Sequence, residues 1–141
     1  MRLRSFSAVG VVAAAAALVA LTASPAAAID ATSSCTTPDG GAWGSWGGNW
    51  ASSTSIKDLW LDAQDEEPDG RHPEVRLVTY TNSGVRVNWP WHAATGGSGD
   101  YQVWHTSASD SRGILIARVE VANFDRDSLM SSCLSASRNN Y

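Results

Sequence analysis

The chain has little positive charge and few cysteines. Lys57 is its one lysine, and the 10 Lys and Arg residues stand against 14 Asp and Glu residues among 141. A polybasic patch of the kind that binds nucleic acid or an anionic membrane surface is therefore excluded. The two cysteines form no CxxC pair, which argues against a thiolate metal site. We expect no nucleic-acid partner and no cofactor.

Motifs that name a reaction are missing as well. The three histidines form no HExxH sequence, and no Gly-x-Ser-x-Gly elbow is present. A glycosidase needs two carboxylates a few ångströms apart, and no such pair stands out from the other acidic residues. The sequence therefore predicts a protein that is not an enzyme.

A secretory signal peptide is predicted at residues 1–28. Arg2 and Arg4 supply its positive start, residues 9–21 form a short apolar run, and Ala28 ends a run of small residues suited to signal peptidase. A retained membrane anchor is the alternative, but the apolar run is shorter than the about 18–20 residues that span a bilayer. Cleavage after Ala28 would remove both arginines and leave 8 basic residues against 14 acidic ones. We expect a secreted, extracellular, acidic protein that has no membrane association after cleavage.

Cys35 and Cys133 are the only cysteines and lie near the two ends of the predicted mature chain. An even number of cysteines in an exported protein favours a disulfide, and two cysteines allow one pairing. Closing so long a loop would stabilise the fold by about 4–5 kcal/mol in the chain-entropy model. A domain of this size buries a modest core, so such a covalent link is useful.

Alternation of apolar and polar residues predicts strands from Ile56 onward, and helical periodicity is nearly absent. The turn Thr81–Gly84 predicts a hairpin, residues 127–132 suggest one helical turn, and the C-terminal tail looks frayed. The pattern is typical of an all-β fold, a small antiparallel β-sandwich with one disulfide joining its ends. The predicted parts are a signal peptide (1–28), a Gly/Ser/Trp-rich N-terminal arm (29–55), a β-sandwich domain (56–133) and a C-terminal tail (134–141).

Seven tryptophans are many for this length. An indole offers a flat apolar face and an N–H donor, so exposed tryptophans are common contact points for partners. Trp89 is in phase with its apolar neighbours and is expected in the core, whereas Trp60 could face either the second layer or solvent. The glycines of the arm predict a loosely ordered segment rather than a helix, although the spacing of Trp43, Trp46 and Trp50 would align them on one face of a helix. For the arm, folding back over a sheet edge and docking onto a partner remain equally open. The residues predicted to bind a partner are Trp43, Trp46, Trp50, Trp91 and Trp104.

Acidic residues gather within residues 62–69. Their oxygens could hold Ca²⁺, but the spacing does not match an EF-hand loop and Pro68 interrupts the run. A solvated loop without metal is the favoured interpretation. The weak calcium candidates are Asp62, Asp65, Glu67 and Asp69.

Several short segments carry a resemblance. They are Leu59-Trp60-Leu61-Asp62, Asp69-Gly70-Arg71, Arg118-Val119-Glu120-Val121 and a late cysteine, Cys133. With these segments the chain resembles small secreted actinobacterial β-sandwich proteins, some of which are similar to the small adaptor subunit of umbrella toxin particles. That resemblance implies a sandwich that links a lectin-like subunit to a large toxin chain through an extended N-terminal segment. The arm would then add a strand or hydrophobic anchors to its partner.

These observations together predict a secreted, non-enzymatic β-sandwich interaction module, an adaptor that binds another secreted protein through the arm and exposed tryptophans. One alternative is a carbohydrate- or cell-wall-binding module, with Trp91, Trp104 and the arm tryptophans stacking on an extracellular glycan. Another is a secreted enzyme inhibitor that uses residues 91–99 as a rigid reactive loop.

Overall fold

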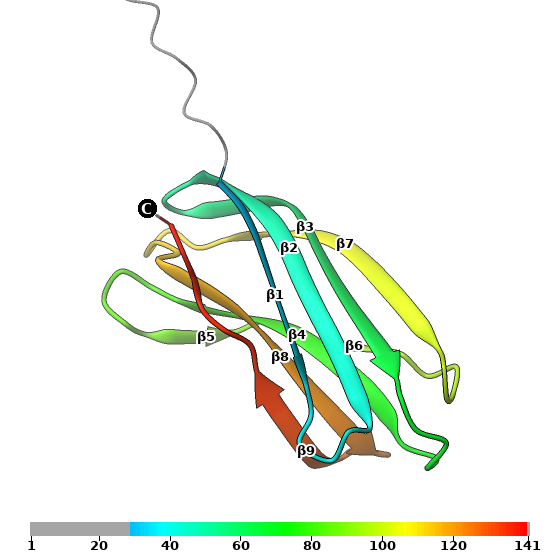
Figure 1. Ribbon diagram of the computed structural model, residues 1–141. Coiled ribbons are helices and arrows are strands. Elements are labelled where there is room, and N and C mark those ends of the chain that lie inside the picture. The colour runs from blue at the N-terminus through cyan, green and yellow to red at the C-terminus, as the bar shows by residue number, and fades with distance from the viewer. Residues whose placement is uncertain (1–28, 141) are drawn as a thin grey trace, which may run out of the picture.

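The computed structural model describes residues 29–140, which form two antiparallel β-sheets packed face to face (Figure 1). The predicted signal peptide lies outside the described residues. The expectation of an all-β, sandwich-like fold is therefore confirmed.

Sheet A contains four strands in the order β1-β2-β3-β7. Their bounds are β1 Ile29–Thr36, β2 Ala42–Ser52, β3 Ser55–Asp65 and β7 Tyr101–Ser109.

Sheet B is built around two long central strands, β4 (His72–Tyr80) and β8 (Ile116–Asp125). Both of its outer edges are interrupted. Strands β5 (Arg86–Asn88) and β6 (His92–Ala93) pair with successive parts of β4, while β9 (Ser128–Leu134) and β10 (Arg138–Asn139) pair with successive parts of β8. The predicted hairpin around Thr81–Gly84 joins β4 to β5, and Gly84 supplies the left-handed backbone (φ +81°) that the turn requires.

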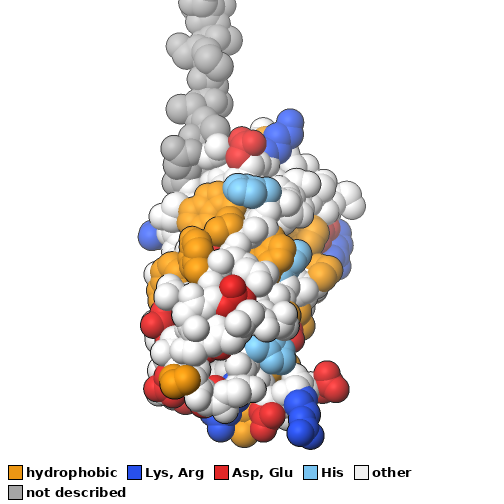
Figure 2. Space-filling view, turned by 90° about the vertical axis from the view of Figure 1, so that its right-hand side faces the viewer, with side chains coloured by type: hydrophobic (Ala, Val, Ile, Leu, Met, Phe, Trp, Pro, Cys, Tyr) orange, Lys and Arg blue, Asp and Glu red, His pale blue; other side chains and the backbone are white. Residues whose placement is uncertain are grey.

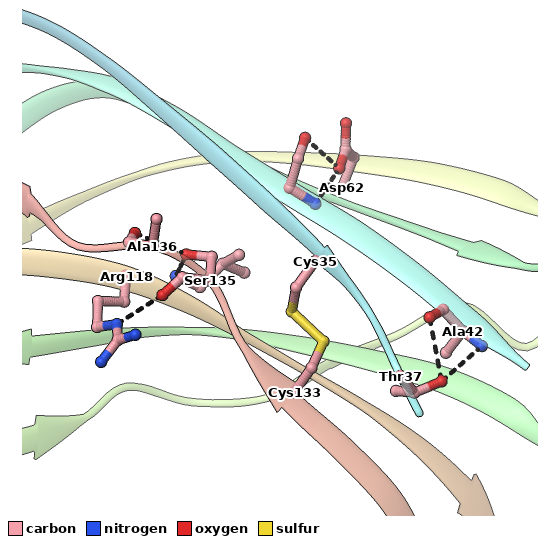
Figure 3. The surroundings of a disulfide bond; sticks show 10 residues. Cys35, Thr37, Ala42, Asp62, Arg118, Cys133, Ser135 and Ala136 are labelled. Atoms are coloured by element: carbon pink, nitrogen blue, oxygen red, sulfur yellow. Dashed lines mark hydrogen bonds between the residues drawn. A yellow bond between two sulfur atoms is a disulfide. The ribbon is translucent and has the colours of Figure 1, made fainter. Parts of the chain in front are cut away.

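The predicted disulfide is present and joins the two sheets. Cys35 on β1 of sheet A is bonded to Cys133 on β9 of sheet B, with 6.2 Å between their Cα atoms and a separation of 98 positions in sequence (Figure 3). The bond closes the same side of the sandwich on which β1 faces the C-terminal strands.

The expectation of a loosely ordered N-terminal arm is wrong. Its residues form β1, β2 and the start of β3, and β2 is paired with a neighbour on each side. The glycines that suggested flexibility serve close packing instead. A Cβ atom at Gly44 would lie 2.6 Å from the backbone oxygen of Asp62 and 2.9 Å from a methyl carbon of Val121, so only glycine fits there.

The expectations for the C-terminal region are also wrong. Residues 127–132 belong to a tight turn and to β9 rather than to a helical turn, because Arg126 adopts a left-handed backbone (φ 55°) that sends the chain back along β8. The tail forms β10, which pairs with the start of β8. Ser135 holds the stretch between β9 and β10 in place, since its backbone N–H donates to the carbonyl oxygen of Val119 (2.9 Å) and its carbonyl accepts from Arg118 Nε (2.6 Å) (Figure 3).

The core lies between the sheets and draws on both. Its largest side chain is Trp46, which is fully buried and packs edge to face against Trp50 with 5.9 Å between ring centroids. The Trp50 indole N–H donates to the carbonyl oxygen of Ile114 (3.2 Å). Leucines of β3 and β4 and valines of β8 fill the remaining space, namely Leu59, Leu61, Leu77, Val119 and Val121.

Candidate functional site

The structure separates the five tryptophans predicted to bind a partner. Trp46 and Trp50 have 0% and 5% of their surface exposed, so neither is available as a contact in the folded protein. Helical spacing suggested that Trp43 would share a face with them. In a strand, however, side chains alternate between faces, and Trp43 lies on the outer side of sheet A, three residues from the buried Trp46.

Trp91 and Trp104 lie apart from each other as well. Trp91 covers the outer side of sheet B, where the guanidinium of Arg76 sits 4.2 Å from its ring centroid and the ring of Phe124 meets it edge to face at 5.6 Å. Trp104 lies on the inner side of β7, packed against the core and beside the His92 ring at 5.3 Å. One continuous tryptophan surface is therefore not formed by the predicted set.

The outer side of sheet A carries three rows of side chains across β2, β3 and β7. The register aligns Trp43 with Gln64 and Tyr101, Ser45 with Asp62 and Val103, and Gly47 with Trp60 and His105. Tyr101 and Val103 have 51% and 42% of their surface exposed. Among the described residues, no other element is packed over this face, which leaves it available to a ligand or partner.

Asp62 holds the middle row together. Its carboxylate is 3% exposed although it lies on the outer side of the sheet. One oxygen accepts both the backbone N–H of Ser45 (2.6 Å) and the hydroxyl of Ser45 (2.7 Å) (Figure 3). The other oxygen accepts the hydroxyl of Tyr101 (3.0 Å). These hydrogen bonds tie β2, β3 and β7 together and satisfy the buried charge.

A shallow depression lies at one end of this face and has Trp60 in its lining. Trp60 extends over Gly47, because a Cβ atom at Gly47 would lie 2.4 Å from the indole carbon Cζ2. The depression has a volume of about 720 Å³. Its other lining side chains are mostly polar and include Thr32, Asn49, Asp58, His105 and Thr106.

A second cleft opens sideways between the two sheets, beside β7. It has a volume of about 280 Å³. Its lining includes Leu61 of β3, Leu77 of β4, Trp89, His92 and Thr106 of β7. Trp89 was expected in the core; it is partly buried against it, and its indole N–H donates to the hydroxyl of Thr79 (3.0 Å).

The aspartates proposed as calcium candidates are engaged in separate hydrogen bonds. Asp62 is engaged in the network on sheet A, Asp65 accepts the backbone N–H of Glu67 (3.2 Å), and Asp69 accepts that of Arg71 (2.9 Å). Within residues 29–140, no group of three or more His, Cys, Asp or Glu side chains is placed to hold a metal ion.

The pKa values of two carboxyl groups near the acidic residues 62–69 are shifted in opposite directions. Burial raises the pKa of Asp65 above its ordinary value, and the nearby Asp69 and Asp100 add to the effect. Burial alone would also raise the pKa of Asp39. Hydrogen bonds from Thr37, Asn123 and Gly41, together with the neighbouring Arg71, outweigh burial and lower it.

Comparison with known proteins identifies no relative: no family model matches the chain, and neither does any curated protein or solved structure. In the part of the chain that the structure describes, no helix is long and apolar enough to cross a membrane. Sequence reasoning left Trp60 open, although its position out of phase with Leu59 and Leu61 was the signal that it faces outward.

Proposed function

We propose that the protein is an exported, non-enzymatic interaction module that acts as an adaptor by accepting an extended segment of another extracellular protein as a further strand beside β7. The proposal keeps the adaptor role that the resemblance implies but moves the contact away from the N-terminal segment. That segment is already built into sheet A. The observation that carries the proposal is the free edge of β7.

The edges of the sandwich differ in how they are protected. Both edges of sheet B are interrupted, one at Trp89-Pro90-Trp91 and the other at residues 135–137. The β1 edge of sheet A is partly covered, because Arg138 Nε donates to the carbonyl oxygen of Thr32. Breaks, proline and covering side chains are the usual means by which proteins prevent strands from adding to an edge.

Strand β7 shows none of these features. It runs without interruption over nine residues, Tyr101–Ser109, and contains no Lys, Arg, Asp, Glu, Pro or Gly. Within residues 29–140 its only strand neighbour is β3. An uninterrupted, uncharged edge of this length offers a row of backbone donors and acceptors to an extended peptide.

The lateral cleft indicates which side chains the added strand would carry. A strand hydrogen-bonded to β7 would direct alternate side chains toward the gap between the sheets, where Trp89, Pro90 and Thr106 line the cleft. Backbone pairing supplies affinity, and pockets for alternate side chains supply specificity. We therefore expect a segment in which small or medium apolar residues alternate with polar ones.

Charge favours a different protein over a second copy of this chain. The sequence has a net charge of −4 at pH 7, and two identical acidic domains repel each other when paired edge to edge. A neutral or basic partner segment is not repelled in this way. Pairing of two β7 strands is the competing outcome that the experiment must separate.

A proline at Ser107 tests the proposal. The Asp65 N–H donates to the carbonyl of Asp100, and hydrogen-bonded residues alternate along an antiparallel ladder. Residues 102, 104 and 106 of β7 therefore direct their backbone N–H and C=O groups to β3. Ser107 follows them, so its N–H points to the free edge. Ser107→Pro removes that donor and leaves the pairing with β3 intact. Ser107→Ala retains the N–H and is the matched control.

The mature protein and both variants are used to capture proteins from the producing organism's culture supernatant, and the captured partner is purified and recombined with each. We expect binding to wild type and Ser107→Ala, loss with Ser107→Pro, and slowed hydrogen exchange across residues 101–109 in the complex. Equal binding by Ser107→Pro, or protection confined to another surface, would overturn the proposal. A homodimer that Ser107→Pro disrupts would assign the edge to a second copy instead.

A further inference from the structure

We propose that the depression around Trp60 is a binding site for an uncharged pyranose unit of an extracellular glycan. This site is on the outer side of sheet A and does not depend on a strand being added to β7. It also differs from the tryptophan set that the sequence suggested, because Trp60 was not among those residues.

The Trp60 indole lies over the backbone of β2. Gly47 is directly opposite Trp60 in the β2–β3 register, and the indole occupies the space that a side chain at Gly47 would fill. The ring is partly exposed and lines an open depression rather than a deep pocket. A flat indole presented on a sheet face suits the apolar C–H face of a pyranose ring, which is flat and of similar width.

A β-bulge in β3 lies next to Trp60. The register of β3 shifts between Ile56 and Leu59 against β7, and Asp58 inside this bulge has a positive φ of 49°. A left-handed backbone at a non-glycine residue is costly, and bulges often redirect a side chain toward a functional surface. Here the bulge places Asp58 in the lining of the depression, where Asn49 Nδ2 lies 3.4 Å from its Oδ2.

The lining supplies the hydrogen bonds that a sugar requires. Asp58 accepts from hydroxyl groups, the Asn49 amide both donates and accepts, and Thr32 and His105 add further polar atoms. The lining thus combines one flat apolar ring with polar side chains that can donate to and accept from sugar hydroxyls.

The charge of the lining selects the class of glycan. Its nine residues include one carboxylate, Asp58, and neither Lys nor Arg. An acidic polysaccharide would bring a second negative charge to Asp58 without a cation to offset it. The side of the sandwich that carries β7 shows hydrophobic groups, histidines and an acidic side chain near its centre, with Lys and Arg toward its margins (Figure 2). We infer a neutral hexopyranose, with or without an N-acetyl group.

Titration calorimetry of the mature protein tests this inference. The probes are cellohexaose and N-acetylated chitohexaose, which share the neutral pyranose chemistry, and an oligogalacturonate of equal length, which carries carboxylates. We expect binding of at least one neutral probe at micromolar to millimolar concentration and none of the oligogalacturonate. The neutral probe that binds more tightly identifies the source of the sugar.

Variants then locate the site. Trp60→Ala is expected to weaken binding at least about tenfold, and Asp58→Ala about three- to tenfold, each corresponding to the loss of one direct contact. Trp91→Ala, on the outer side of sheet B, is the matched control and should bind as wild type. Near-ultraviolet circular dichroism and thermal unfolding check that each variant is folded.

Gly47→Ala provides a test that keeps every proposed contact residue. Its Cβ atom would collide with the indole, so Trp60 must shift off the sheet, and binding should fall with it. No binding of either neutral hexamer, or equal binding by wild type and a folded Trp60→Ala, would overturn the assignment. Loss of glycan binding with Trp60→Ala but not with Ser107→Pro would separate this site from the proposed β7 edge.

Discussion

The hydroxyl of Tyr101 donates a 3.0 Å hydrogen bond to the carboxylate of Asp62, which is otherwise held by Ser45. This contact joins β7 to the centre of sheet A through side chains as well as through the backbone. It also fixes the strand whose opposite edge we propose as the partner site. The Asp62 side chain is almost completely buried, so each of its donors matters for stability.

Removing the Tyr101 hydroxyl should destabilise the fold. Tyr101→Phe leaves one oxygen of a buried carboxylate without this donor, and we expect a loss of about 1–3 kcal/mol in the free energy of unfolding. Urea unfolding followed by circular dichroism measures the change. Val103→Ala, on the same strand and face, removes only exposed apolar surface and is the control. An unchanged unfolding midpoint for Tyr101→Phe would show that the contact does not contribute.

The same contact should delay ionisation of the phenol. The hydrogen bond to Asp62 is the main reason why the pKa of Tyr101 is raised above 10.0, and burial and the carboxylate charge add to it. In the folded protein Tyr101 should therefore become tyrosinate at higher pH than a free tyrosine does. Ultraviolet titration of wild type, Tyr101→Phe and Asp62→Asn measures this. The proposed cause would be contradicted if Asp62→Asn left the titration of Tyr101 unchanged.

Loss of the disulfide should remove a large part of the stability. Replacing Cys35 and Cys133 together by Ala frees a loop of 98 residues, and the chain-entropy model gives a loss of about 4–5 kcal/mol. Differential scanning calorimetry of the double variant against oxidised wild type measures it. Reduced wild type is the matched control, because it has the same sequence without the bond. Equal melting temperatures for all three would refute a stabilising role.

Asp39 should make stability depend on pH in the acid range. The pKa of Asp39 in the folded protein is below its ordinary value, so the unfolded chain binds the proton first as the pH falls. The resulting stabilisation is present above the unfolded pKa and is lost as the pH falls through the lower, folded pKa. Asp39→Asn should flatten this part of the curve of unfolding free energy against pH. A wild-type slope that persists in Asp39→Asn would assign the acid sensitivity to other groups.

Gly44 tests the explanation for the glycine-rich strand. Gly44→Ala would place a methyl group 2.6 Å from the backbone oxygen of Asp62, and backbone at the centre of a sheet cannot easily move. We expect destabilisation of about 1–3 kcal/mol from this overpacking. Gly70→Ala, at a loop position with nothing within 4 Å, changes only backbone strain and serves for comparison. A smaller effect at Gly44 than at Gly70 would contradict the packing argument.

The strands from Ile56 onward were predictable because they bury one face and leave the other in contact with solvent or polar groups. Alternation in β3, β4 and β8 is visible in the sequence for this reason. The β4–β5 hairpin was predictable from its turn residues, and the disulfide from the presence of just two cysteines. The alternation showed that Trp60 lies on the face of β3 opposite to Leu59 and Leu61. It did not show whether that face is covered by the second sheet or exposed to solvent.

The sequence by itself determined the class of the fold, the hairpin and the covalent link, since each depends on local periodicity or on a unique pairing. Only the tertiary structure showed that residues 29–55 form strands of sheet A. Their glycines suggest flexibility in isolation, yet they are required where Asp62, Val121 and Trp60 approach the backbone of β2. It also decided which tryptophans are buried and which edge is free. Those properties depend on neighbours distant in sequence, and no local pattern records them.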